Sequence, residues 1–246
     1  MLPKHDEITL FRRVIEAACI TSAAGLLVWQ AVRLLTSPGI FTWSTLAVLL
    51  LGMLAADFVS GLVHWTADTW FEETMPVLGR RLLRPFRVHH VNPDDFLRRG
   101  FLTVNGDVSL ICLPFLAAVF ALPLETVWGR LLGVFVVSFA AVGLPTNQVH
   151  QWAHMPAPPR WVRWLQRRRI ILSREDHWQH HHPPYAQFYC IATGWLNRPL
   201  SRIDFFRRAE RVVSAWTGMQ PRADDDQFQL QLQAELATHI VGERGA

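Results

Sequence analysis

Four stretches of the chain are almost wholly apolar, and each is about as long as a bilayer is thick. They span residues 14–35, 40–63, 108–127 and 131–149. A helix needs about 20 mostly apolar residues to cross the hydrocarbon core of a membrane, and a spanning segment must satisfy its backbone groups internally. The pattern therefore predicts an all-α, polytopic membrane bundle of about four transmembrane helices.

The four runs form two pairs, and a short polar link joins each pair. Thr36-Ser37-Pro38-Gly39 joins the first pair, and Trp128-Gly129-Arg130 joins the second. Because such short links connect antiparallel neighbours, we predict two helical hairpins. The first run is longer than the apolar part of a signal peptide and a second run follows it, so we expect it to be retained. Prolines at 114, 123 and 145 predict kinks.

Lysine and arginine are biased to one side of this predicted bundle. Of the 24 basic residues, three precede the first run, six lie between 64 and 107, thirteen follow 150, and only Arg33 and Arg130 lie in the outer turns. Basic residues accumulate on the cytoplasmic side during membrane insertion. The three larger polar segments are therefore predicted to be cytoplasmic, in a bacterial inner membrane or, for a eukaryotic protein, in the endoplasmic reticulum.

Composition argues against a disulfide scaffold and against a nucleic-acid-binding protein. Half of the residues are hydrophobic, 18% are charged and 11 are tryptophan, a residue enriched at membrane interfaces. Three widely spaced cysteines do not fit a disulfide framework. The basic residues accompany the apolar runs, which suits membrane orientation, so we predict no nucleic-acid partner. A soluble protein would need two adjacent pairs of uncharged helices of spanning length inside a small domain.

Eight of the eleven histidines fall into three groups, and every group lies in a segment predicted to be cytoplasmic. Helical spacings of three or four residues bring side chains onto one face, so several of these rings are predicted to converge. Asp68 follows the first histidine by four residues and shares its predicted face. The groups are His64 with His89 and His90, His150 with His154, and His177 with His180 and His181.

This density of imidazole predicts a metal centre. Imidazole suits iron, zinc, copper and nickel, and eight rings are too many for one ion. Because zinc takes four ligands and often uses cysteine, two ions of a redox metal such as iron are the simpler interpretation. Two alternatives without a ligand role remain. His64, taken alone, fits an interfacial polar residue, and His182, which lies beside two prolines, fits a residue outside the metal site.

Polar residues near the groups are candidates to orient the ligand rings, since ligating imidazoles usually donate their second N–H to a carboxylate or carbonyl. Asp68 is also a candidate for direct metal binding. The predicted orienting residues are Asp68, Asp107, Asn147 and Asp176.

Eight short motifs follow one another between about Asp57 and Asp225. They are Gly61-Leu62-Val63-His64-Trp65 with Asp68, Arg84-Pro85-Phe86-Arg87 with His89-His90, Asn105-Gly106-Asp107, Thr146-Asn147-Gln148 with His150 and His154, Pro159-Arg160-Trp161-Val162, His177 with His180-His181, Thr193-Gly194-Trp195-Leu196-Asn197 and Pro221-Arg222-Ala223-Asp224-Asp225. In this order they resemble the plasmanylethanolamine desaturases, a family that includes Kua-type and CarF-like lipid desaturases. Asp176 stands where animal members place a further histidine, and His182 has no counterpart there.

The resemblance implies O2-dependent desaturation of the alkyl chain of an ether phospholipid, which gives the vinyl ether of a plasmalogen. It also implies that the eight histidines bind two iron ions. Residues 14–226 are then expected to form one lipid-desaturase domain, preceded by a cytoplasmic N-terminus (1–13) and followed by a tail (227–246). Four arginines are predicted to bind the lipid headgroup: Arg80, Arg81, Arg84 and Arg87.

Desaturation also needs electrons, and the sequence has neither a dinucleotide fingerprint nor a haem or iron–sulfur motif. An external cytochrome b5-like or ferredoxin-like donor is therefore expected to dock on the cytoplasmic side. Within the same chemistry, an acyl-chain desaturase or a hydroxylase of a membrane phospholipid is the alternative. We expect no plastid transit peptide, because the chain begins almost directly at its first apolar run. From other classes, a zinc-dependent membrane hydrolase remains open. A metal transporter is the last alternative, because its ligands should lie near the bilayer midplane, whereas these histidines lie at the ends of the predicted spans.

Overall fold

Each long helical segment of the protein extends beyond its predicted apolar run at one end or both. The computed structural model describes residues 9–182 and 185–222, and these contain helices but no strand. Most of the predicted N-terminus and the whole of the predicted tail at 227–246 lie outside this range. Four segments are long and apolar enough to span a membrane, which confirms the predicted bundle. They are α1 (Leu10–Leu35), α2 (Trp43–Thr69), α5 (Phe101–Ala118) extended by the 3-10 turn η2 (Val119–Ala121), and α6 (Val127–Gly143) continued by α7 (Thr146–His154).

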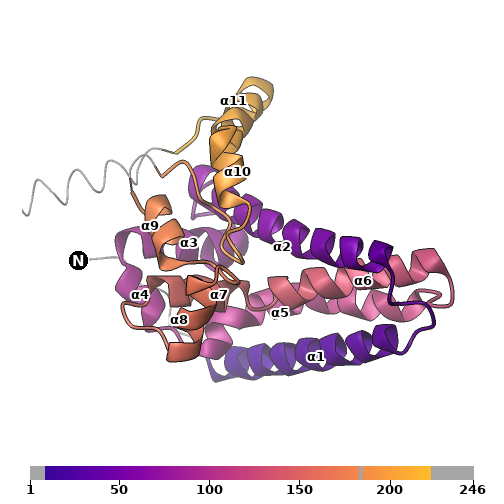
Figure 1. The fold of residues 1–246 in the computed structure, drawn as a ribbon. Coiled ribbons are helices and arrows are strands. Elements are labelled where there is room, and N and C mark those ends of the chain that lie inside the picture. Colours follow the sequence, from indigo (N-terminus) through magenta and orange to yellow (C-terminus); the bar gives the residue numbers. More distant parts are fainter. Residues whose placement is uncertain (1–8, 183–184, 223–246) are drawn as a thin grey trace, which may run out of the picture.

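The four long segments lie side by side, with α1 packed mainly against α5 and α2 against α6. Their short connections, α1 to α2 and α5 to α6, lie at one end of the bundle, as Figure 1 shows. The remaining helices gather at the opposite end, close to the histidines. They are the π-helical turn η1 (Gly79–Leu83), α3 (Arg84–Val91), α4 (Pro93–Leu97), α8 (Arg160–Arg167), α9 (Arg174–His180), α10 (Asn197–Arg202) and α11 (Phe205–Thr217).

The predicted link at Trp128-Gly129-Arg130 is wrong, because these residues lie in the first turn of α6. The actual connection precedes it, from Leu122 to Thr126. Pro123 lies in that connection, where the lack of a backbone N–H is harmless. Thr126 then caps α6, since its hydroxyl accepts a hydrogen bond from the Gly129 amide at 3.0 Å.

Polar residues also continue α5 beyond the predicted run. The third run was expected to begin at 108, but α5 begins at Phe101 and therefore includes Asn105 and Asp107. Near the end of the fourth run, Pro145 separates α6 from α7. Backbone hydrogen bonding does not need apolar side chains, so a helix ends at its caps and prolines and not where hydropathy changes.

The α2–α6 contact depends on a glycine. A Cβ atom on Gly52 would lie 2.0 Å from the Ser138 hydroxyl oxygen and 2.7 Å from the Phe135 carbonyl oxygen. Small residues allow such close approach of membrane helices, which association in lipid depends on.

We expect Gly52→Ala to lower the thermal unfolding temperature of the detergent-solubilised protein, with a loss of about 1–3 kcal/mol typical of overpacking. Gly25→Ala is the matched control, because no atom lies within 4 Å of its added Cβ and alanine is the better helix former. Equal unfolding temperatures for the two variants would contradict the packing role of Gly52.

Candidate metal centre

The eight predicted ligand histidines converge, although they come from four helices and the residue after one of them. His64 lies on α2, His89 and His90 on α3, His150 and His154 on α7, and His177 and His180 on α9, which His181 follows. They form two groups, and in each the ligand atoms lie within 4.8 Å of one another. For comparison, two nitrogens on opposite sides of one ion lie about 4.2 Å apart at a bond length of ~2.1 Å.

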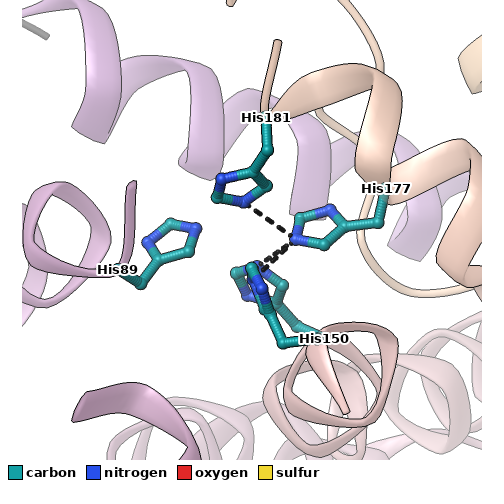
Figure 2. A group of neighbouring side chains, drawn as sticks. His89, His150, His177 and His181 are labelled. Atoms are coloured by element: carbon teal, nitrogen blue, oxygen red, sulfur yellow. Dashed lines mark hydrogen bonds between the residues drawn. The ribbon is translucent and has the colours of Figure 1, made fainter. Parts of the chain in front are cut away.

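The first group contains five histidines: His89, His150, His154, His177 and His181. The Nε2 atom of His177 is its centre, at 3.0 Å from Nε2 of His150, 2.7 Å from that of His154 and 3.1 Å from that of His181. Figure 2 shows the ring of His89 approaching from the opposite side, on α3. Its Nε2 atom is buried and has no hydrogen-bond partner among the described residues.

These contacts fit a bound cation better than a hydrogen-bonded cluster. A neutral imidazole carries a single N–H, so Nε2 of His177 and its three neighbours cannot all be paired as donor with acceptor. Facing lone pairs repel one another, and burial strengthens that repulsion. A metal ion among the nitrogens turns the same arrangement into an attractive one, so the residues present fit a metal.

The second group contains three histidines and one carboxylate. Oδ2 of Asp68 lies 3.1 Å from Nε2 of His64 and 3.3 Å from Nε2 of both His90 and His180. All four residues are buried. Asp68 thus occupies a position equivalent to the three rings, which favours direct metal binding over the orienting role also considered for it.

The rings outside the membrane spans are held in the neutral form that metal binding requires. Burial, followed by repulsion from neighbouring imidazoles, holds the pKa of His89, His177 and His181 well below the usual value. Burial is also the largest cause that lowers the pKa of His180, to about 4. These rings therefore offer a lone pair at neutral pH and need not lose a proton to bind a metal.

Backbone carbonyls, and not the predicted carboxylates, orient two of the ligand rings. Nδ1 of His64 donates to the Tyr189 carbonyl at 3.1 Å, and Nδ1 of His180 donates to the Gln187 carbonyl at 3.0 Å. In this tautomer each Nε2 atom keeps its lone pair and points into the second group. Both carbonyls belong to the segment before α10.

Sequence analysis missed Asp57, the residue that holds this segment against α2. Its buried carboxylate accepts backbone hydrogen bonds from Thr193 at 2.7 Å, Gly194 at 2.9 Å and Leu196 at 3.1 Å. Within the segment, the Asn197 side chain pairs with both backbone groups of Cys190. A lone carboxylate near the end of an apolar run was the available signal, because a buried charge needs such partners.

The other predicted orienting residues contact different partners. Asp107 forms ion pairs with Arg12 and Arg81, and Asp176 forms one with Arg198. The Asn147 side chain donates to the Val104 carbonyl on α5. His182, which was considered as a spare, is exposed and contacts the Trp178 carbonyl outside both ligand groups.

The predicted headgroup arginines also differ from one another. Arg87 is buried, and its guanidinium donates to the carbonyls of Ala67, Trp70 and Phe71. It therefore attaches α3 to the end of α2, which is a structural role and leaves it no access to a lipid headgroup. Arg80 and Arg81 are exposed, and Arg84 is half-buried.

A cavity of about 240 Å³ reaches the first ligand group. His89 and His150 line it, and most of its other lining residues are apolar, among them side chains of α2, α5 and α6. We call it the reaction cavity. Such a cavity, with apolar walls and a few polar groups, is typical of a small-molecule or lipid site. Its lining residues come from segments far apart in the sequence, so the sequence alone does not predict it.

The comparisons with known proteins agree with this geometry. The lipid desaturase domain family matches residues 53–224, which include every histidine of both groups. The chain belongs to this family, and it is thus an oxidoreductase of the desaturase class.

Several proteins named as desaturases are similar in sequence to most of this chain. A plasmanylethanolamine desaturase of Myxococcus xanthus is 44% identical over 87% of this chain and 76% of its own length. Plasmanylethanolamine desaturase 1 of the mouse is 43% identical over 71% of this chain and 66% of its own length. A chloroplastic fatty acid desaturase 4 of Arabidopsis thaliana is 33% identical over 70% of this chain and 52% of its own length. No solved structure matches.

Proposed function

We propose that the protein is a di-iron, O2-dependent plasmanylethanolamine desaturase, which introduces the vinyl-ether double bond of a plasmalogen. The observation that carries this proposal is the pair of adjacent, mostly buried ligand groups at the end of an apolar cavity. The names of the bacterial and mouse relatives support the substrate. Five histidines in one group exceed the four ligands usual for zinc, which supports iron.

The reaction balances with an external source of electrons. Two hydrogens leave the first two carbons of the alkyl chain, and O2 takes them up together with two electrons and two protons, which gives the double bond and two water molecules. Two bound iron ions would supply the redox chemistry that activates O2. The electrons would come from a cytochrome b5-like or ferredoxin-like partner, which we expect on the cytoplasmic side with the histidines.

The side chains of the protein position the substrate and the ligands. Eight imidazoles and the Asp68 carboxylate would hold the ions, and the carbonyls of Tyr189 and Gln187 fix two of the rings. The apolar walls of the reaction cavity, among them Val63, Phe86 and Ile191, would exclude water and keep the alkyl chain beside His89 and His150.

A feeding experiment tests the proposed function. Cells that lack plasmalogens and have a competent electron donor are given a 1-O-alkyl phospholipid precursor, with and without this gene, and acid-labile vinyl ethers are measured by mass spectrometry. We expect vinyl ether with the wild-type protein and none with His181→Ala. His182→Ala is the matched control, since this neighbouring ring lies outside both groups, and it should remain active.

One other function has a specific observation in its favour. The Arabidopsis relative is named as a fatty acid desaturase, so an acyl-chain desaturase with the same metal centre is the second candidate. An absence of vinyl ether, together with a new double bond in an acyl chain of the same cells, would support it. Membership of the desaturase family sets aside the hydrolase and transporter interpretations.

A further inference from the structure

A second cavity, of about 270 Å³, adjoins the reaction cavity. It lies between α1 and α5, and its apolar lining residues are Phe11, Ile15, Cys19 and Leu110. We call it the outer cavity. Arg81 and Asp107 line both cavities, so these two charged side chains form the boundary between two largely apolar spaces.

A network of charged side chains surrounds this boundary. The Asp107 carboxylate lies 3.2 Å from the Arg12 guanidinium and 3.6 Å from that of Arg81. Arg12 also pairs with Glu16, at 2.8 Å. Both Arg81 and Asp107 remain partly exposed, with side-chain exposures of 49% and 35%, so a ligand can reach them.

Arg99 adds a third positive charge, and it faces the reaction cavity. Its Nε atom is buried and has no hydrogen-bond partner among the described residues. Burial, and then repulsion from Arg12, lowers the pKa of Arg99 to about 10. A buried guanidinium N–H without an acceptor is costly, and an anionic oxygen in the cavity would satisfy it.

We propose that the boundary binds the phosphoethanolamine headgroup of a two-chain phospholipid, with its alkyl chain in the reaction cavity and its second chain in the outer cavity. This inference rests on the proposed function. Arg81 and Arg99 bind the phosphate, and Asp107 accepts hydrogen bonds from the ammonium group. A carboxylate has about four lone-pair positions, and its two arginine contacts leave room for a further donor.

The position of the new double bond supports this placement. A vinyl ether forms at the two carbons next to the ether oxygen, so the glycerol must lie within a few bonds of the metal ligands. The reaction cavity meets this requirement because the polar side chains of Arg81 and Asp107 line the same space as His89 and His150.

The rest of the alkyl chain needs an apolar path toward the membrane interior. Val104, Val108 and Cys112 on successive turns of α5 line the reaction cavity. Cys112 follows Val104 by eight positions, which corresponds to about 12 Å along α5. Phe139 on α6 and Val59 on α2 line the same space, so the walls of the path come from both hairpins.

The outer cavity gives α1 a part in substrate binding. This helix precedes the region matched by the desaturase family, which begins at residue 53. It lies close against α5, since a Cβ atom on Gly106 would lie 2.4 Å from Cγ of Glu16. A lipid with two hydrocarbon chains joined at one glycerol matches two apolar cavities joined at one charged boundary.

The second chain is tested by filling the outer cavity. Purified protein with its electron donor is given either a 1-O-alkyl-2-acyl or a 1-O-alkyl-2-hydroxy glycerophosphoethanolamine. We expect Ile15→Trp to lower the ratio of kcat/KM for the two-chain lipid over the single-chain lipid about tenfold. Val14→Trp is the matched control, because Val14 lies outside this lining and is exposed, and its ratio should equal the wild type. An unchanged ratio in Ile15→Trp would overturn the assignment of the second chain.

The headgroup is tested by binding as well as by turnover. Wild-type protein and Asp107→Asn are incubated with vesicles that contain equal amounts of ethanolamine and choline 1-O-alkyl-2-acyl lipids, and the retained lipids are measured by mass spectrometry. A primary ammonium donates hydrogen bonds and a trimethylammonium does not, so we expect the wild type to retain more ethanolamine lipid. Asp107→Asn should reduce this preference at least fivefold, and Arg99→Gln should reduce retention of both lipids.

These outcomes separate the two proposals. If no vinyl ether forms but the Asp107-dependent preference is present, the headgroup site stands and the proposed reaction fails. If vinyl ether forms but Asp107→Asn keeps the wild-type preference both in binding and in turnover, the reaction stands and the headgroup site is overturned.

Discussion

Asp68→Asn is expected to abolish desaturation and to lower the bound iron from two ions per chain to one. The Asp68 carboxylate lies within 3.3 Å of the Nε2 atoms of three histidines. The amide that replaces it has nearly the same size but no charge, and one of its ends carries donors that repel a cation. Elemental analysis of the purified variant measures the iron, and vinyl-ether formation measures the activity.

The size of the effect distinguishes the two roles considered for Asp68. Residues that only orient a ligand ring typically change metal affinity or activity about 10–100-fold, so two bound ions with weak residual activity would contradict direct binding. Asp176→Asn is the matched control, because it makes the same chemical change at a buried aspartate that pairs with Arg198. It should retain both ions.

The bundle was predictable from the sequence because its determinants are local. An uninterrupted apolar run indicates a spanning helix whatever its neighbours are, and all four runs became such helices. The same holds for ligands spaced by one helical turn. His64 and Asp68 share a group, and so do His150 and His154, as four-residue spacing predicts.

The division of the histidines between the two groups depends on helix direction as well as on sequence position. His89 and His90 are neighbours on α3, yet they belong to different groups, since successive residues on a helix point about 100° apart. His177 on α9 and His181, which follows this helix, belong to the first group, whereas His180 belongs to the second. The spacing of the histidines does not predict which helices meet at each group, because that depends on the tertiary structure.

The residues that orient the ligands were not predictable for a different reason. The predicted acceptors were carboxylates, but the acceptors for His64 and His180 are backbone carbonyls. Every residue has a carbonyl, so these contacts leave no signal in the sequence. Likewise, the sequence does not distinguish Arg87 from the other three predicted headgroup arginines. Its burial and its hydrogen bond to a backbone carbonyl are visible only in the structure.

Asp57→Asn is expected to destabilise the protein and to weaken the metal centre together. The carboxylate accepts three backbone N–H groups, and the amide would turn a donor toward one of them. Because hydrogen bonds to a charged group contribute about 1.5–3 kcal/mol each, we expect a loss of about 3 kcal/mol. The segment that Asp57 holds carries the Tyr189 carbonyl that fixes the ring of His64, so the loss should reach the second ligand group.

Thermal unfolding in detergent and iron content measure the two effects. Asp204→Asn is the matched control, because Asp204 is exposed, pairs only at 3.6 Å with Arg211 and has a positive φ of 53° that asparagine also tolerates. A normal iron content in a destabilised Asp57→Asn protein would mean that the carbonyl contact is dispensable for binding. Loss of iron without loss of stability would mean that Asp57 acts on the metal centre alone, whereas its contacts predict that both fall together.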